Sequence, residues 1–291
     1  MTEAKTQKQL KLKADEIRQD IIKMLLSAGS GHTAGPLGLA DIFTALYFDD
    51  LLKYNPSKPN WPERDRLVLS NGHCCPVLYA TLAHAGFFSR NELSNLRKFG
   101  SMLQGHPERE RVPGLETTSG PLGSGLGQAA GMAYGFKIDN SKNQHVVCIC
   151  SDGEHQEGNT WEAIMFAGKY SLHNLTVIID RNNIQIDGFT EQVMPLEPLA
   201  MKYQAFNWHV LEVDGHDFSQ IKSAYYEAKS IFEKPTVIIA HTIPGKGVDF
   251  MQNDFKWHGY DPNPSNARRD YNTALHELRT LQGRIKSGEN E

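Results

Sequence analysis

The chain has 291 residues, of which 40% are hydrophobic, and it carries a formal net charge of −4. Such a chain can bury a substantial core, as one large α/β domain or as two smaller domains. Acidic and basic residues are interspersed, which argues against a surface for nucleic acid or for an anionic membrane. The N-terminus is polar, and no apolar run approaches the roughly 18–20 residues that span a bilayer. We therefore expect a soluble, cytoplasmic protein with no nucleic-acid or membrane partner.

The cysteines give no indication of a disulfide framework or a zinc site. The C-x-x-C spacing that is typical of zinc sites does not occur among the four of them, which are Cys74, Cys75, Cys148 and Cys150. Because cysteine is among the residue types most often buried, we expect four buried, reduced thiols.

The first half of the chain is predicted to be mainly helical. Residues 8–28 carry apolar side chains at helical spacing. The glycine-rich stretch 27–38 interrupts this pattern, and a second apolar helix is expected to follow it through Leu52. A short strand is expected at 68–69, with another helix after it. Residues 100–125 are rich in glycine and proline, lack periodicity and are expected to form a loop.

The second half alternates between predicted strands and helices. Continuous apolar runs predict strands at 145–150, 175–180, 208–213 and 236–241. Helices are predicted between them at 159–170, 196–205 and 218–232, and one charged helix closes the chain. Because the strands are continuously apolar rather than alternating, the pattern is typical of a parallel sheet that is covered on both faces. We therefore predict an α/β fold with a mostly parallel sheet and helices on both faces.

Polar residues follow two of the predicted strands. Asp152 follows the strand at 145–150, and Asn182 follows the strand at 175–180. With one helix between them, these strands would be parallel neighbours, and ligands bind at the carboxyl ends of such strands. A carboxylate, a carboxamide oxygen and a main-chain carbonyl suit Mg²⁺, and Gly153 would let the backbone approach a phosphate. Asp-Gly and Asn-Asn are also common turn pairs, so the spacing alone leaves both interpretations open.

A second glycine pattern superficially indicates a dinucleotide site. Residues 125–130 read G-x-G-x-x-A, but a loop precedes them where a dinucleotide site needs a buried strand. We therefore reject that interpretation and expect Gly127 and Gly131 to allow close helix packing.

Several stretches together resemble the transketolase family. Asp152-Gly and Asn182-Asn resemble the thiamine diphosphate motif, which reads GDG, about 25–30 residues, then NN. Further stretches stand in the order of a transketolase N-terminal half, at 30–38 (SGHTAGPLG), 69–80 (LSNGHCCPVLYA), 103–108 (LQGHPE), 120–133 (GPLGSGLGQAAGMA) and 255–259 (FKWHG). The resemblance spans about residues 10–260. It implies a thiamine diphosphate-binding fold, with 1–291 as a single domain and 262–291 as its C-terminal extension.

The resemblance also implies roles for individual residues. Mg²⁺, for which Ca²⁺ or Mn²⁺ can substitute, would be held by Asp152, Asn182 and the main-chain carbonyl of Ile184. Thiamine diphosphate would be contacted by His73, Gly120, Pro121, Leu122, Gly153, Glu154, Asn182 and His241. One position departs from the motif, because Ser151 stands where the family has glycine. Serine adds a side chain at a tight strand end, and we expect cofactor binding to survive it.

The remaining implied roles concern catalysis and assembly. The catalytic histidines would be His32, His73, His106 and His258, since an imidazole can accept a proton from one hydroxyl and donate to another oxygen near neutral pH. Glu157 and Glu162 would lie at the subunit interface. Taken singly, a histidine after glycine is more often a loop residue, and a glutamate on a helix is more often a solvent-exposed one.

Transketolases are roughly twice as long as this chain, and their second domain carries the glutamate that activates the cofactor. The resemblance therefore implies a split transketolase in which a C-terminal transketolase subunit supplies the pyrimidine-binding domain, in an α₂β₂ heterotetramer. The reaction would transfer a two-carbon ketol unit between sugar phosphates, as in the pentose phosphate pathway. The alternatives are an α-type subunit of a 2-oxo acid dehydrogenase, a deoxyxylulose-phosphate synthase-like subunit, or a non-catalytic regulatory paralogue. The histidine stretches favour transketolase, and the identity of the sugars stays open.

Overall fold

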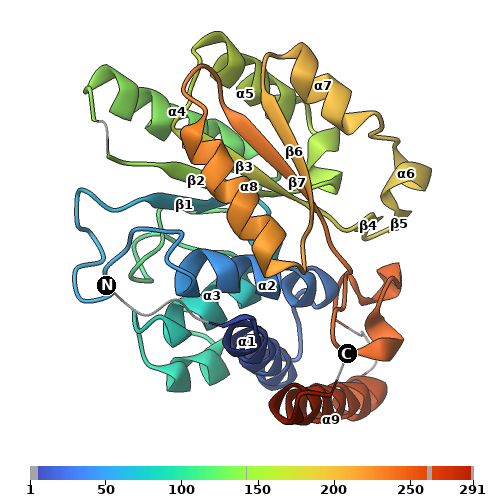
Figure 1. Ribbon diagram of the computed structural model, residues 1–291. Coiled ribbons are helices and arrows are strands. Elements are labelled where there is room, and N and C mark those ends of the chain that lie inside the picture. Colours follow the sequence, from blue (N-terminus) through green and yellow to red (C-terminus); the bar gives the residue numbers. More distant parts are fainter. Residues whose placement is uncertain (1–5, 142, 261–263, 290–291) are drawn as a thin grey trace.

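The computed structural model describes residues 6–141, 143–260 and 264–289, and a parallel sheet lies at its centre (Figure 1). The sheet has five strands in the order β1-β2-β3-β7-β6, all parallel. Their bounds are Arg66–Leu69 (β1), Val146–Ser151 (β2), Leu175–Arg181 (β3), His209–Asp214 (β6) and Thr236–His241 (β7). A short antiparallel pair, Ile184–Gln185 (β4) and Gly188–Phe189 (β5), follows β3 outside this sheet.

Helices cover both faces of the sheet, as predicted. One face is covered by Gln7–Ala28 (α1), Ala34–Phe48 (α2), Cys75–His84 (α3), Phe218–Ser230 (α8) and Pro264–Ser287 (α9). The other is covered by Ser124–Ile138 (α4), Gly158–Lys169 (α5) and Leu199–Ala205 (α7). Figure 1 shows α4, α5 and α7 on one side of the strands, with α1, α2, α3 and α9 on the opposite side.

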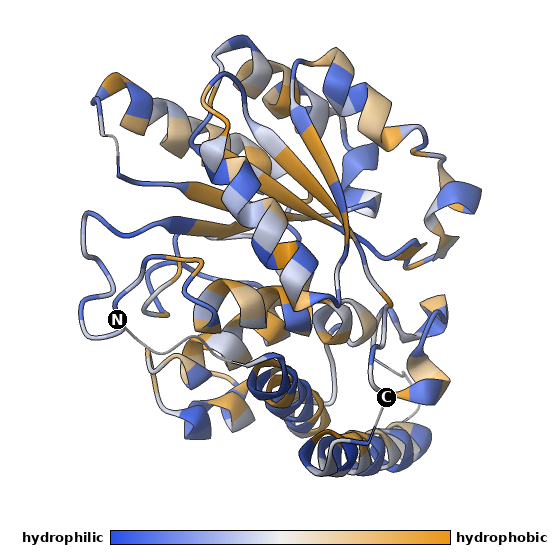
Figure 2. Cartoon of the chain, in the orientation of Figure 1, coloured by the Kyte–Doolittle hydropathy of each residue, from blue (hydrophilic) through white to orange (hydrophobic). Residues whose placement is uncertain are grey.

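The alternation of side chains along each strand explains the continuous apolar runs. In β2, Val147 and Ile149 point into the core beneath α1 and α2, whereas Cys148 and Cys150 point into the core beneath α4 and α5. Because both faces of the central strands are buried, both sets of positions are mainly apolar, and Figure 2 accordingly shows apolar strands at the centre. The prediction of a parallel α/β sheet is confirmed.

Several element boundaries differ from the prediction. The second helix ends at Phe48 rather than at Leu52. Two residues after Phe48, Asp50 adopts a positive φ of 55°, and an α-helix cannot continue through this conformation. The helix expected at 196–205 begins at Leu199, because a residue that precedes a proline, here Glu197 before Pro198, disfavours helical backbone. The short elements β4, β5 and Thr190–Val193 (α6) were not predicted.

The glycines of α4 have a different role from the one expected. The helix follows a loop rather than a strand, as predicted. The expectation for Gly127 and Gly131 was wrong within the described chain, because a Cβ added to either would meet no atom of another element within 4 Å. Close packing falls instead at Gly125, where a Cβ would lie 2.5 Å from the Cα of Ser70.

The C-terminal segment belongs to the core. Tyr271 and Leu278 of α9 are buried in the same cluster as Ile17 of α1, so the described part of the expected extension 262–291 packs into the domain. Residues 262–263 and 290–291 of that extension lie outside the described ranges. All four cysteines are buried and free, as expected.

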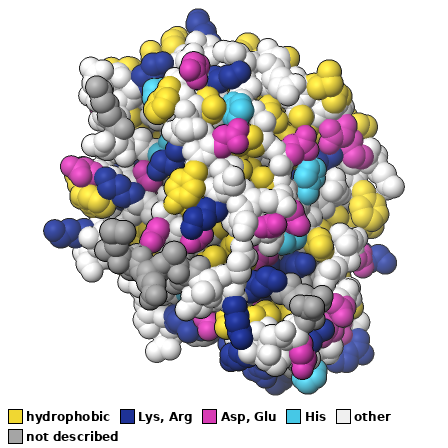
Figure 3. Space-filling model, in the orientation of Figure 1, with side chains coloured by type: hydrophobic (Ala, Val, Ile, Leu, Met, Phe, Trp, Pro, Cys, Tyr) yellow, Lys and Arg dark blue, Asp and Glu magenta, His cyan; other side chains and the backbone are white. Residues whose placement is uncertain are grey.

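The surface offers no evident patch of a single charge sign on the face that Figure 3 shows, where acidic and basic side chains are both spread widely. Within the ranges described above, no helix combines the length and the apolar character needed to cross a bilayer.

Candidate active site

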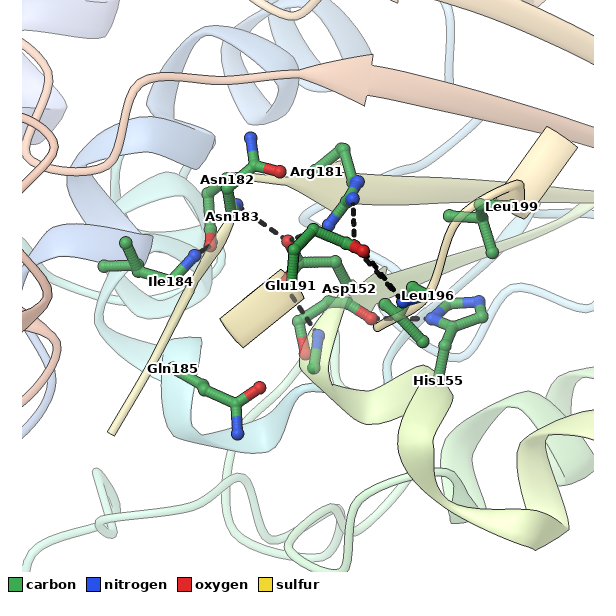
Figure 4. Close-up of polar contacts among 12 residues, drawn as sticks. Asp152, His155, Arg181, Asn182, Asn183, Ile184, Gln185, Glu191, Leu196 and Leu199 are labelled. Carbon is green, nitrogen blue, oxygen red and sulfur yellow. Dashed lines mark hydrogen bonds and ion pairs between the residues drawn. The ribbon is translucent and has the colours of Figure 1, made fainter. Parts of the chain in front are cut away.

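The carboxyl ends of β2 and β3 bring the Asp-Gly and Asn-Asn pairs together. The two strands pair in parallel, with Ser151 aligned with Asp180. The main-chain N–H of Asn183 donates to the Asp152 carboxylate across 2.7 Å, which joins the two turns directly (Figure 4). The prediction that these pairs converge at one edge of the sheet is confirmed.

Asp152 is fully buried and is held by three donors. Its Oδ1 accepts the N–H of Gly153 at 2.7 Å. Its Oδ2 accepts the N–H of Asn183 at 2.7 Å and the guanidinium of Arg181 at 3.0 Å. Burial raises the pKa of Asp152, against the opposing effect of Arg181 and of the two N–H groups. Since a carboxylate has about four lone-pair directions, one direction on Oδ1 stays available to a cation.

Asn182 presents its amide oxygen in a fixed orientation. Its Nδ2 donates to the Asp180 carboxylate at 2.7 Å, and its Oδ1 accepts the N–H of Ile184 at 3.0 Å. The described chain contains no metal-binding group of three or more His, Cys, Asp or Glu residues, so a cation at this edge would depend on amide and carbonyl oxygens. The oxygens of Asp152, Asn182 and the Ile184 main chain are of the hard type that Mg²⁺ prefers, and the residues therefore fit such an ion.

Three histidines from distant segments form one cluster. His32 precedes α2, His73 lies in the short helix Gly72–Cys74, and His258 follows the short helix Phe255–Trp257. The ring centroids of His32 and His73 are 4.8 Å apart, and each lies 5.3 Å from that of His258. The main chain fixes this meeting, because the N–H of Thr33 donates to the carbonyl of His258 at 3.2 Å.

The cluster is built to stay uncharged near neutral pH. Burial lowers the pKa of His32 to about 3 and that of His258 to about 4, and it holds the pKa of His73 well below its usual value. The Nδ1 atoms of His32 and His258 are buried and have no hydrogen-bond partner within the described residues. Buried polar atoms are almost always paired, so these two nitrogens are suited to a ligand that would pair them.

The fourth histidine lies at the edge of the cluster. His106 is exposed, and its pKa is lowered by partial burial and by Arg97. It is close enough for its charge to lower the pKa of both His32 and His73.

The loop at 119–123 lies against the turn that carries His73. A Cβ on Gly72 would lie 2.8 Å from the Cβ of Ser119 and 3.0 Å from the nitrogen of Gly120, so this loop packs directly on the turn that carries His73. A Cβ on Gly120 itself would meet nothing within 4 Å in the part of the chain that the structure describes. Gly120 therefore leaves open space beside the turn that carries His73, with Leu122 half-buried and Pro121 exposed.

Glu154 faces inward rather than into open space. Its carboxylate accepts the N–H of Gly123 at 2.5 Å, the N–H of Ser151 at 3.2 Å and the hydroxyl of Ser70. It thereby ties the 119–123 loop to the ends of β1 and β2, and burial raises its pKa. Its geometry fits a residue that positions this loop.

The replacement of the motif glycine is accommodated without strain. Ser151 is the last residue of β2, in extended backbone that any residue adopts. Its carbonyl oxygen lies 2.7 Å from Nδ1 of the buried His155. The structure therefore places no demand for glycine at this position.

The other predicted residues lie on the surface. His241 ends β7 and is exposed, with its Nε2 2.9 Å from Glu212. Glu157 precedes α5 and Glu162 lies on it, and both are exposed. All three are free to meet a ligand or another chain, and their roles stay predictions.

One buried residue at this edge was missed by the sequence analysis. Arg181 is only 4% exposed, and it pairs with Asp152, with Glu191 at 2.6 Å and with Glu197 at 2.9 Å. One feature of the sequence could have indicated Arg181. It is a basic residue in a stretch that is expected to bind a cation, where a positive charge needs a reason. Asp180, which accepts the Asn182 amide, and Thr242, which donates to Asp180, had no feature in the sequence that marked them.

Residues 10–268 match the family described as transketolase, thiamine diphosphate binding domain. The 6-deoxy-6-sulfo-D-fructose transketolase subunit of Clostridium sp. (strain MSTE9) is 43% identical over 249 residues, which are 86% of this chain and 90% of that protein. An apulose-4-phosphate transketolase subunit of Phocaeicola vulgatus is 42% identical over 269 residues, which are 92% of this chain and 93% of that protein.

The structural comparison agrees. The crystal structure of transketolase from Campylobacter jejuni superimposes with a TM-score of 0.83 at 34% identity, covering 97% of this chain and 48% of that one. The chain thus spans about half the length of the solved transketolases it matches and nearly all of the two subunits. The chain belongs to the transketolase family, and residues 10–268 are its thiamine diphosphate-binding domain.

Proposed function

We propose that the chain is the N-terminal, cofactor-binding subunit of a split transketolase. In this proposal it transfers a two-carbon ketol unit from a ketose or its phosphate to an aldose or its phosphate, and it acts only together with a partner. The proposal depends on the similarity to two relatives that are named as transketolase subunits. Each alignment covers more than 85% of this chain and 90% or more of the relative. Because these two are named for different sugars, the proposal specifies only the class of substrate.

In this proposal, the edge formed by β2 and β3 holds the cofactor's diphosphate through a divalent cation. Asp152, Asn182 and the main-chain carbonyl of Ile184 would be the protein ligands of Mg²⁺, with Ca²⁺ or Mn²⁺ as substitutes. The free direction on Asp152 Oδ1 and the fixed Asn182 amide support this assignment. Gly153, which follows β2, and His241, which ends β7, would face the diphosphate. Bound thiamine diphosphate supplies the electron sink that carbon–carbon cleavage needs.

The histidine cluster would handle the hydroxyl groups of the sugar. A neutral imidazole has one nitrogen that accepts and one that donates a hydrogen bond. His32, His73 and His258 can therefore orient hydroxyls as neutral donors and acceptors near neutral pH, with His106 at the edge of the site. The open space at Gly120, with Pro121 and Leu122 beside it, would receive the ring system of the cofactor.

The proposed partner is a C-terminal transketolase subunit that carries the pyrimidine-binding domain. We propose an α₂β₂ heterotetramer in the cytoplasm, with the exposed Glu157 and Glu162 of α5 at a subunit interface. The names of the two subunit-type relatives support the existence of a partner. The four free, buried thiols agree with a reducing compartment.

Capture of the tagged full chain from its native host, with thiamine diphosphate and Mg²⁺ present, tests this assembly. Native mass spectrometry should find a companion of roughly equal size, in equal number, with bound cofactor. The captured complex should use a ketose phosphate as donor and should not use pyruvate, since pyruvate offers no hydroxyl groups to the histidine cluster. A homo-oligomer without a companion would support the regulatory alternative, and pyruvate as the only donor would support a 2-oxo acid dehydrogenase or deoxyxylulose-phosphate synthase-like subunit.

A further inference from the structure

The Arg181 side chain lies behind the proposed metal ligand Asp152. Arg181 is the last residue of β3 and directly precedes Asn182, the second proposed ligand. Its Nη1 donates to Asp152 Oδ2 at 3.0 Å, and its Nη2 donates to Glu191 at 2.6 Å (Figure 4). Nη2 also donates to Glu197 at 2.9 Å. One guanidinium thus bridges a fully buried carboxylate and two partly exposed ones.

The bridge fixes the guanidinium from both sides. Arg181 is 4% exposed, and a buried cation is stable only when it is paired and hydrogen-bonded. Glu191 and Glu197 come from the segment around α6 and hold the guanidinium through Nη2, whereas Asp152 is bound by Nη1. The planar guanidinium can make these contacts simultaneously, which a lysine ammonium cannot reproduce in the same geometry.

The hydrogen bonds to Asp152 are distributed unequally between its two oxygens. Oδ2 accepts both Arg181 and the N–H of Asn183, whereas Oδ1 accepts only the N–H of Gly153. Two strong donors occupy the lone pairs of Oδ2, so the acceptor direction that is left lies on Oδ1. Arg181 therefore decides which carboxylate oxygen is available to a cation.

The charges of the bridge also favour a divalent cation nearby. Arg181 contributes one positive charge, while Asp152, Glu191 and Glu197 contribute three negative ones, so the group retains a net negative charge. The guanidinium can therefore orient Asp152 without cancelling the attraction of this edge for a metal ion.

We propose that Arg181 is a positioning residue for the metal site, which turns Oδ1 of Asp152 toward the cation and is itself anchored by Glu191 and Glu197. This inference rests on the proposed role of Asp152 as a metal ligand. It adds to that role a group that touches neither metal nor cofactor but sets the geometry of the ligand.

Mn²⁺ titration of the full chain in its purified native complex, with thiamine diphosphate present, tests the role of Arg181. Bound Mn²⁺ is followed by the loss of the free-ion signal in electron paramagnetic resonance, which reports binding rather than turnover. Arg181→Ala should weaken Mn²⁺ binding about 10–100-fold, as loss of groups that orient metal ligands commonly does. Arg181→Lys should recover part of this loss because it restores one charged donor.

Two further variants make the result specific. Arg64 is 12% exposed and pairs with Glu116 through two 2.7 Å hydrogen bonds, so Arg64→Ala removes a comparable ion pair elsewhere and should leave Mn²⁺ binding unchanged. The double variant Glu191→Gln/Glu197→Gln keeps Asp152 and Arg181 but removes the charged anchor, and should weaken Mn²⁺ binding severalfold. If Arg181→Ala does not fold, this double variant still tests the positioning role of Arg181.

Asp152→Ala separates the two levels of the proposal. If Asp152→Ala abolishes Mn²⁺ binding while Arg181→Ala, or the double glutamate variant, stays within twofold of the unaltered protein, the positioning role is overturned and the metal site stands. If Asp152→Ala binds Mn²⁺ as the unaltered protein does, the metal assignment itself is wrong, and the role of Arg181 is overturned with it.

Discussion

The side-chain amide of Asn182 donates to the Asp180 carboxylate across 2.7 Å, and this contact fixes the direction of the Asn182 amide oxygen. The other oxygen of Asp180 accepts the hydroxyl of Thr242, which follows β7. Asp180 is completely buried, and burial raises its pKa to about 7 although both donors oppose the rise. The proposed metal ligand Asn182 is thus oriented by the Asp180 carboxylate. The hydrogen bonds from Asn182 and Thr242 favour the ionised form of Asp180.

The Thr242 hydroxyl should therefore matter to both stability and metal binding. Thr242→Val keeps the shape of the side chain but leaves Asp180 Oδ1 without its donor, and we expect a loss of about 1–3 kcal/mol in the free energy of unfolding. Mn²⁺ binding with thiamine diphosphate should weaken in parallel. Thr236→Val, on β7 itself, is the control, because the Thr236 hydroxyl is buried and unpartnered among the described residues. Equal effects of the two variants on unfolding and Mn²⁺ binding would contradict the account.

The histidine cluster should make stability depend on pH. The pKa of His32 is about 3 in the folded chain, below its ordinary value of 6.5, so the unfolded chain binds more protons between these values. Stability should therefore fall as the pH drops from about 6.5 toward 4. In His32→Gln the slope over this range should be smaller, by up to about 1.4 kcal/mol per pH unit, the effect of one proton.

Urea unfolding of the isolated chain at several pH values measures this slope. His276→Gln is the control, because His276 is exposed on α9 and meets water in both states. An unchanged slope in His32→Gln would mean that the cluster takes up protons without unfolding.

Two nearby glycines of α4 should respond oppositely to alanine. Gly125→Ala places a Cβ 2.5 Å from the Cα of Ser70, and this clash is relieved only if the backbone moves. The substitution should therefore lower the free energy of unfolding by about 1–3 kcal/mol. Gly127→Ala meets nothing within 4 Å among the described residues and should stabilise the isolated chain by about 0.5–1 kcal/mol, since alanine favours helix. Denaturant unfolding of both variants checks the sign, and a loss of stability in Gly127→Ala would contradict it.

Glu154 should hold the 119–123 loop in place. Glu154→Gln keeps the shape but turns one acceptor oxygen into a donor that faces N–H groups, so we expect a loss of about 1–3 kcal/mol. Hydrogen exchange at Gly123 should become faster in this variant. Glu110→Gln, at an 84% exposed side chain, should change neither quantity. Unchanged exchange at Gly123 in Glu154→Gln would show that the loop is held by other contacts.

The sheet and the meeting of Asp152 with Asn182 were predictable because both follow from local patterns. Continuous apolar runs report burial on two faces, and polar pairs at the ends of adjacent parallel strands must meet at one edge. The α4 glycines were misjudged for the opposite reason. Spacing alone does not reveal which face of a helix another backbone approaches, and the approach falls at Gly125.

Contacts between distant segments could not be predicted from the chain. His32, His73 and His258 come together through tertiary packing, and only the family resemblance grouped them. The inward orientation of Glu154 and the bridge made by Arg181 depend on partners that no periodicity marks. Short elements such as β4 and α6 carry too few residues for a pattern.

The most direct test of the proposed function is the transfer reaction of the purified complex that contains this chain. With thiamine diphosphate, Mg²⁺, a ketose phosphate donor and an aldose phosphate acceptor, mass spectrometry should find one sugar lengthened and the other shortened by two carbons. Omission of the cofactor, or the variant Asp152→Ala, should abolish both products. Two-carbon transfer that persists at full rate without the cofactor or with Asp152→Ala, or a complex that binds the cofactor yet transfers only from pyruvate, would contradict the proposed function.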